Sequence, residues 1–175
     1  IIKEEKIPQL VSTDMLVEKV HFDTSYVPLK HLGYKSIVVN ISDICAMGGA
    51  ATHALVSLGI PNKYSVEHVE ELYWGVKAAC KNYNLDLIGG DTTASPTGLI
   101  ISVTILGKEN GLFPITRSGA KPNDIVAVSG DLGASYLGLQ ILEREKAIFE
   151  NSQNQQPSLE AYSYILERQL KPEAQ

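Results

Sequence analysis

Three aspartates have the residue type and the surroundings needed to hold a divalent cation. Asp14 in "STD", Asp43 in "NISD" and Asp91 in "GGDTT" lie beside small or hydroxyl residues, within or at the end of apolar segments. Carboxylates are costly to bury unless they are paired, so three that converge would need a cation between them. Ligands that are all oxygen favour Mg²⁺ over Zn²⁺. Spacing alone does not show that the three meet, and a turn acid, a helix-surface acid and an N-cap remain alternative interpretations.

A phosphate-binding segment would be the natural companion of such a site. Neither G-x-x-x-x-G-K-[ST] nor G-x-G-x-x-G after a strand occurs in the chain, which disfavours the standard nucleotide folds. The stretch "SGDLGAS" (129–135) could direct backbone N–H groups at an anion, although a simple glycine-rich helix entry is the alternative. Arg117 could bind a phosphate through two nitrogens, and the alternative is a solvated loop arginine.

The elements that carry these residues predict a mixed α/β fold. Alternation in "PQLVSTDMLV" predicts a strand with Ser12 and Asp14 on the face opposite Thr13. Helical spacing predicts a helix over 32–47 that carries Asp43 off its apolar stripe. Ser65 is typical of an N-cap, which predicts a second helix leading towards residue 87.

The remaining segments extend this pattern. Further strands are predicted in "THALVSLGIPN", "GLIISVTILGK" and "DIVAVSG", and another amphipathic helix in "GDLGASYLGLQILEREK". We interpret "LIGGDTT" (87–93) as the end of a buried strand followed by a tight glycine turn that exposes Asp91. Residues 1–149 are expected to form an amino-terminal domain that carries the candidate Mg²⁺ site. Residues 150–175 are expected to form a linker and the first helix of a further domain, because "ENSQNQQPS" is polar and contains proline.

Composition and charge exclude some classes of protein function. A net charge of −5 without any cluster of lysine and arginine argues against nucleic-acid binding. The apolar stretches are too short for a membrane span and "IIKEEKIPQL" does not resemble a secretion signal, so we expect a cytoplasmic protein. Cys45 and Cys80 are expected to be reduced thiols on helices.

Five stretches together resemble thiamine-monophosphate kinases. They are "STDMLVEKVHF" (12–22), "NISDICAMGG" (40–49), "LIGGDTT" (87–93), "RSGAKPND" (117–124) and "VSGDLGASYLGL" (128–139), and the resemblance runs from about Val11 to Leu142. The wider family includes selenophosphate synthetase, aminoimidazole ribonucleotide synthetase and a hydrogenase-maturation protein. "TDMLVE" followed closely by "VHF", and "GGDTT", favour the thiamine-phosphate branch, and no reactive cysteine of the selenophosphate branch is seen near the start.

The resemblance implies the amino-terminal domain of the aminoimidazole ribonucleotide synthetase-like fold, with a mixed sheet flanked by helices. It also implies ATP-dependent phosphorylation of thiamine monophosphate to thiamine diphosphate, several Mg²⁺ ions and a homodimer whose partner completes a larger sheet. A site lined by acids repels ATP unless Mg²⁺ reverses its field, so catalysis would rest on positioning and charge neutralisation without a protein nucleophile.

Each implied role falls on a matching position of this chain. The residues are Asp14, Asp43 and Asp91 as Mg²⁺ ligands with Ser12 and Thr13; Gly90, Asp91, Arg117 and, on a weaker match, Tyr73 as ATP contacts; and His21 as a thiamine monophosphate contact. For Tyr73, helix packing stays open as the alternative.

This chain departs from the family pattern in three places. The family's upstream "GDD" acids have no counterpart, since only Glu4 and Glu5 precede "STD". Lys19 stands where the family commonly has glycine, just before His21. The family's carboxy-terminal domain, which supplies further contacts, would follow Gln175, so the resemblance does not imply that this stretch is active alone. A selenophosphate or purine-pathway synthetase and a non-catalytic nucleotide-binding relative remain alternative functions.

Overall fold

The computed structural model describes residues 2–4, 7–111, 114–151 and 159–174, and the chain divides into two compact units. The first unit is Ile1–Thr116 with Glu173–Gln175, and the second is Arg117–Pro172. Each carries its own secondary structure. The first contains one sheet and two helices, whereas the described helices of the second are not accompanied by any strand among its described residues.

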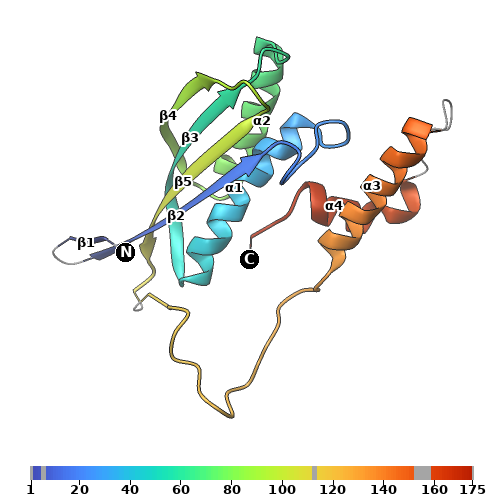
Figure 1. The fold of residues 1–175 in the computed structure, drawn as a ribbon. Helices are drawn as coiled ribbons and strands as arrows, with labels where there is room; N and C mark the ends of the chain where they lie inside the picture. Colours follow the sequence, from blue (N-terminus) through green and yellow to red (C-terminus); the bar gives the residue numbers. More distant parts are fainter. Residues whose placement is uncertain (1, 5–6, 112–113, 152–158, 175) are drawn as a thin grey trace. The chain divides into compact units, whose positions relative to one another are not determined.

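The sheet of the first unit has the strand order β1-β2-β5-β3-β4 (Figure 1). Its strands are β1 (Ile2–Glu4), β2 (Ile7–Val17), β3 (Gly49–Ile60), β4 (Asp86–Ala94) and β5 (Ile100–Glu109). Among the described strands, β3 and β4 pair in parallel, and the other neighbouring strands pair antiparallel. Burial alternates along β5, where Ile101, Val103 and Ile105 point into the core. The mixed α/β prediction is confirmed.

Two helices cover one face of this sheet. α1 (Leu29–Ala46) packs against β2, β5 and β3, and α2 (Val66–Asn82) packs against α1 and β4, so both lie on the same side in Figure 1. The helices approach closely at Gly75, because glycine has no Cβ. A Cβ atom at this position would lie only 1.8 Å from the carbonyl oxygen of Lys30. α2 begins after Ser65 as predicted, and the Ser65 N–H donates to Nδ1 of His68 at 3.2 Å. Both cysteines are free thiols on these helices.

The opposite face of the sheet is open within the first unit. Thr13, Met15 and Ser57 are exposed there, and Ser102 and Thr104 are partly exposed. In the part of the chain that the structure describes, no helix is both long and apolar enough to cross a membrane.

Two predicted elements differ from the structure. "LIGGDTT" is not a strand end and a turn: both glycines and Asp91 lie inside β4, because each residue from Gly89 to Ala94 pairs with β3. Ile88 forms an irregularity in that pairing and is 53% exposed, so this strand is not buried. "DIVAVSG" (124–130) forms no strand, since a strand needs a paired neighbour and this segment has none within the described residues.

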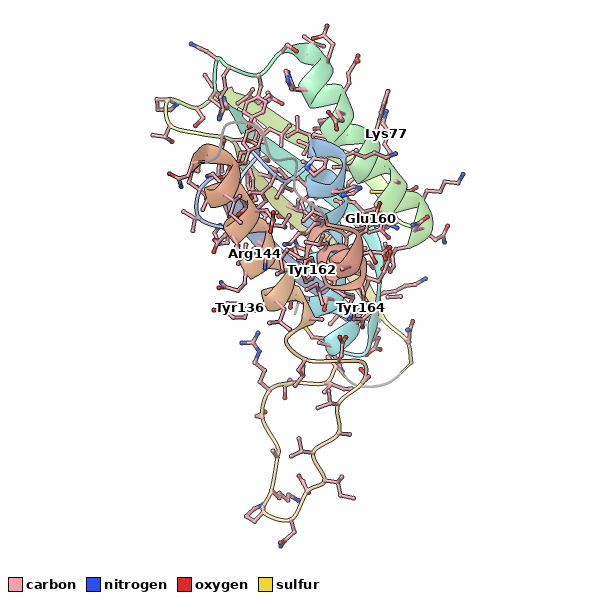
Figure 2. All side chains as sticks on the ribbon, turned by 90° about the vertical axis from the view of Figure 1, so that its right-hand side faces the viewer. Lys77, Tyr136, Arg144, Glu160, Tyr162 and Tyr164 are labelled. Carbon is pink, nitrogen blue, oxygen red and sulfur yellow. The ribbon has the colours of Figure 1, made fainter. Side chains whose placement is uncertain are left out.

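The second unit is built on a pair of helices. α3 (Ala134–Asn151) packs against α4 (Ser163–Leu170), which follows the short 3₁₀ helix η1 (Glu160–Tyr162). The Arg144 guanidinium lies 5.3 Å from the Tyr162 ring centroid, an interaction whose two residues are labelled in Figure 2. The two compact units divide at Thr116/Arg117, and α3 and α4 both belong to the second. The domain boundary expected at 149/150 stays a prediction. The expected linker falls largely on 152–158, outside the described residues.

Candidate functional site

β2 presents hydroxyl groups on both of its faces and a carboxylate on one of them. Ser12 lies on the face that α1 covers and is 8% exposed. Thr13 lies on the open face, where its hydroxyl donates to the Val103 carbonyl at 3.1 Å and contacts the Thr104 hydroxyl. Asp14, two residues after Ser12, is back on the Ser12 side but is exposed. The prediction that Ser12 and Asp14 lie on the strand face opposite Thr13 is confirmed.

Ser12 joins β2 to the predicted metal ligand on α1. Its hydroxyl lies 2.8 Å from Oδ2 of Asp43 and 3.2 Å from Oδ1 of Asn40. The Asn40 amide in turn donates to the Ser36 carbonyl at 3.2 Å, which directs its oxygen towards Ser12. The Asp43 carboxylate is therefore held beside β2, about 7 Å along the strand from the level of Asp14.

Asp91 lies elsewhere on the sheet. The pairing places Asp14, Val103, Val56 and Gly90 in one row across β2, β5, β3 and β4. Three strand spacings separate the ends of this row, or about 14 Å. Asp91 follows Gly90 and therefore points to the opposite, open face. No group of three metal-binding His, Cys, Asp or Glu side chains occurs among the described residues, so this part of the chain does not bring the three aspartates together.

Asp91 borders a shallow pocket of its own on the open face. The pocket has a volume of about 270 Å³, and five of its lining residues carry a hydroxyl group: Ser57, Thr93, Ser95, Thr97 and Ser102. Ser57 pairs with both Asp91 and Ser102 in the sheet. Sequence reasoning missed Ser57 and Ser102. The alternation of β3 and β5 places both on the exposed face, but only the pairing register puts them beside Asp91.

The turn after β2 carries His21 in a fixed arrangement. Lys19 adopts a positive φ of 68°, the conformation for which glycine is suited, and its ammonium pairs with Asp23 at 2.7 Å. The His21 N–H donates to the Val17 carbonyl at 2.9 Å. The Val17 N–H donates to Nδ1 of His21 at 3.1 Å, so the neutral ring carries its proton on the exposed Nε2. The turn thus forms with lysine in the position where the family commonly has glycine.

The two other predicted contacts lie on different elements. Tyr73 is half-buried on α2, and burial raises the pKa of its hydroxyl. That environment suits a packing role and leaves its predicted nucleotide contact untested. Arg117 is exposed and is the first residue of the second unit.

The donor set fits magnesium by its chemistry. Asp14, Asp43 and Ser12 offer only oxygen, and Mg²⁺ in proteins is commonly held by one or two carboxylates while water and substrate phosphates complete its shell. A third carboxylate is therefore not needed at this position. Asp91 could hold a cation only as part of a separate set of ligands.

The sequence profile of the family described as AIR synthase related protein, N-terminal domain, matches residues 2–108. The chain belongs to this family. Within it, the chain is 40% identical over 167 residues to the thiamine-monophosphate kinase of Bacillus subtilis, covering 95% of this chain and 49% of that protein. It is 43% identical over 141 residues to the Aquifex aeolicus thiamine-monophosphate kinase, covering 81% and 45%. The chain therefore spans about half the length of the curated relatives it matches.

Solved structures with a similar fold were also found. AaThiL complexed with AMPPCP and TMP has a TM-score of 0.82 at 35% identity, covering 99% of this chain and 52% of that one. Thiamine-monophosphate kinase from Stenotrophomonas maltophilia has a TM-score of 0.79 at 28% identity, covering 98% and 52%. The hydrogenase maturation protein HypE, at 19% identity and a TM-score of 0.67 over 83% of this chain and 45% of that one, shares the fold. The predicted resemblance to thiamine-monophosphate kinases is confirmed.

Proposed function

We propose that the protein containing this chain transfers the γ-phosphoryl group of ATP to thiamine monophosphate, giving thiamine diphosphate. The observation that carries the proposal is the likeness to AaThiL complexed with AMPPCP and TMP over nearly the whole of this chain. The oxygen-rich stretches inside β2 and β4 supply residue types suited to that chemistry.

In this proposal the acceptor phosphate oxygen attacks the γ-phosphorus in line as the bond to the β–γ bridging oxygen breaks, and ADP leaves. Bound Mg²⁺ would neutralise charge on the phosphates. Asp14 and Asp43 would hold the cation on the α1 side of the sheet, and the Ser12 hydroxyl keeps the Asp43 carboxylate facing β2. Asp91 would hold a cation at the nucleotide phosphates on the open face. Thr13, three strands away on the same face, would offer its oxygen to a separate cation on β2.

The remaining contacts are proposed on exposed groups. His21 would donate its Nε2–H to the phosphate of thiamine monophosphate, since Nδ1 is already occupied by the Val17 N–H. The Gly90 backbone would approach the nucleotide phosphates. Arg117, a planar donor with several N–H groups, would bind an ATP phosphate through two nitrogens.

We also propose that two copies associate through the open face of the sheet, in the cytoplasm. Support comes from the exposed Met15 and the row of hydroxyl groups on that face, to which no helix of the first unit is packed among its described residues. A second copy would cover surface that a single copy leaves in water.

The first test is formation of thiamine diphosphate by the full-length gene product with ATP, thiamine monophosphate and Mg²⁺. Selenide and a purine precursor serve as alternative acceptors. Product from thiamine monophosphate alone is the expected result. Tight Mg·ATP binding with product only from another acceptor would overturn the proposed substrate. Failure to bind nucleotide would overturn the proposal that the protein is a kinase.

A substitution separates the Asp91 site from the fold. Asp91→Asn should abolish Mg²⁺-dependent nucleotide binding, measured by calorimetry, while leaving the unfolding midpoint nearly unchanged because the side chain is exposed. Asp86→Asn, an exposed acid at the start of the same strand, is the matched control and should bind as the unmodified protein does. Unchanged affinity in folded Asp91→Asn would remove Asp91 from the site.

A further inference from the structure

Glu18 is a buried acid in the turn that carries His21. Its side chain is 3% exposed although it is charged, and it directly follows β2. Acids are rarely buried without partners, because leaving a carboxylate unpaired away from water is costly. The partners of Glu18 therefore indicate what this residue holds in place.

Those partners come from three other segments of the first unit. Oε2 accepts the Leu99 N–H at 2.8 Å, just before β5. Oε1 accepts the Thr24 hydroxyl at 3.0 Å and the Lys63 ammonium at 2.5 Å. The Tyr64 hydroxyl, next to Lys63, donates to the same Thr24 oxygen at 3.1 Å. One carboxylate thus ties the end of β2 to the loop after β3, to the entry of β5 and to the residues after the turn.

The network keeps this carboxylate charged. Burial alone would raise the pKa of Glu18, but the Leu99 N–H, Lys63 and Thr24 outweigh it and lower the pKa below the ordinary value. The hydrogen bond to Glu18 raises the pKa of Lys63, which keeps that side chain protonated. Space is also restricted, because a Cβ on Gly98 would lie 3.2 Å from the Glu18 side chain.

The backbone of the same residue closes the turn. The Glu18 N–H donates to the Leu99 carbonyl at 3.0 Å, and Glu18 bridges to Phe22. The Lys19 N–H donates to the Phe22 carbonyl at 2.7 Å. His21 lies inside this closed turn and cannot change direction without disturbing it.

We propose that Glu18 is a positioning residue for thiamine monophosphate: its buried network fixes the turn so that His21 presents Nε2–H outward to the substrate phosphate. The inference rests on the proposed role of His21 in the kinase reaction. Glu18 itself touches no substrate in this scheme. It acts through the imidazole by holding the Val17–His21 hydrogen bonds in register.

The first test compares kinetic constants of the full-length protein. Glu18→Gln keeps the shape but removes the charge, and should raise KM for thiamine monophosphate about tenfold while KM for ATP stays within about twofold. Glu70→Gln, an exposed acid on α2, is the matched control and should change neither constant. A fall in thermal stability with both KM values unchanged would reduce Glu18 to a structural role and overturn the inference.

A double-mutant cycle tests whether Glu18 acts through His21. If it does, Glu18→Gln should add almost nothing to the KM increase already caused by His21→Ala. Fully additive effects would overturn the inference. If Glu18→Gln does not fold, Lys63→Gln takes its place, since the Lys63 side chain is 55% exposed and its removal weakens the same network. It should raise KM for thiamine monophosphate in the same selective way, and an equal rise for ATP would count against the proposal.

A spectroscopic measurement separates this inference from the proposed function. ¹⁵N NMR of labelled histidine at about pH 8 should show His21 as the Nε2–H tautomer in the unmodified protein and as a mixture in Glu18→Gln. An unchanged tautomer in Glu18→Gln would overturn the positioning role even in an active enzyme. An inactive enzyme with the expected tautomer change would instead contradict the proposed kinase activity. Glu18 would then still be the residue that fixes the tautomer of the His21 ring.

Discussion

The β2 side of the sheet and the β4 edge fix their acids by different means. At β2, the Asp43 carboxylate is held through a side-chain hydrogen bond from Ser12, which α1 largely buries. At β4, Asp91 is exposed, and its position is set by the backbone, because Gly90 lies directly against the main chain of Val56. The two acids lie on opposite faces of one sheet.

In the proposed kinase, this difference would meet two separate requirements of phosphate transfer. A ligand fixed by hydrogen bonds needs little reorganisation when a cation arrives, which suits the β2 side. An exposed acid on an edge strand leaves room for a large anionic nucleotide and its cation. Within one chain the two regions are about 14 Å apart across the sheet, so a single ion cannot bridge them.

Breaking the β4 edge should have the largest effect. In Gly90→Ala the new Cβ would lie 1.8 Å from the Val56 carbonyl oxygen, so β4 must move away from β3. We expect a loss of about 2–3 kcal/mol in the free energy of unfolding, measured by urea denaturation. Gly89→Ala is the matched control, since its new Cβ would have nothing within 4 Å, and it should change stability by less than about 1 kcal/mol. Equal losses in both variants would contradict the close β3–β4 approach.

Breaking the β2 side should cost less. Ser12→Ala removes the donor to Asp43, so we expect a loss of about 1 kcal/mol and a higher Mg²⁺ concentration for half-maximal activity. Urea denaturation and a Mg²⁺ titration of the full-length enzyme measure the two effects. Ser42→Ala, one residue before Asp43 and exposed, serves as the control. A Mg²⁺ requirement that is the same in both variants would argue against Asp43 as a ligand held by Ser12.

Acid should weaken the turn next to the β2 side. The pKa of Glu18 in the folded protein lies below its ordinary value of 4.5, so the unfolded chain takes up this proton first as the pH falls. The stability from Glu18 is therefore complete above about pH 4.5 and is lost as the pH falls through the folded pKa. Between about pH 3 and pH 6, the free energy of unfolding should depend more steeply on pH in the unmodified protein than in Glu18→Gln. Parallel pH profiles would show that the carboxylate is not held in its charged form.

The smallest effect is expected at Lys19. Its left-handed backbone costs a residue with a side chain about 1–2 kcal/mol, and the ion pair between the exposed Lys19 ammonium and the largely buried Asp23 returns only part of this. Lys19→Gly should therefore stabilise the protein by about 0.5 kcal/mol, seen as a small rise in the thermal midpoint. Asn84, also at positive φ, provides the comparison, because asparagine tolerates this conformation and Asn84→Gly should change little. A clear loss of stability in Lys19→Gly would mean that the ion pair dominates.

Much of the fold could be predicted from local pattern. Period-two alternation located β2 and β5, and helical spacing with the Ser65 cap located α1 and α2, because these signals depend only on residues close in sequence. The turn predicted at "GGDTT" was wrong because tertiary contacts, which local pattern does not contain, decide its structure. Two glycines locally favour a turn, but pairing with β3 and the Val56 contact draw them into a strand.

The segment "DIVAVSG" shows the reverse error, in which local pattern predicts a strand that the structure does not form. Its short apolar run is typical of a strand, yet Ile125 is 94% exposed and Val126 is 91% exposed, because no other described strand pairs with it. Sequence pattern states what a segment prefers. Whether a strand forms depends on a neighbour that the pattern does not name.

The sequence by itself determined the residue types of the candidate site, the strand that presents Ser12 and Asp14, and the family. Tertiary structure alone decided which of these residues meet: Ser12 with Asp43, Ser57 with Asp91, and Glu18 with Leu99, Thr24 and Lys63. It also separated Asp91 from Asp14 by placing them on opposite faces. The reason is that local propensity acts over a few residues, whereas sheet register and helix packing bring together distant positions such as Thr13 and Val103, which are 90 residues apart in sequence.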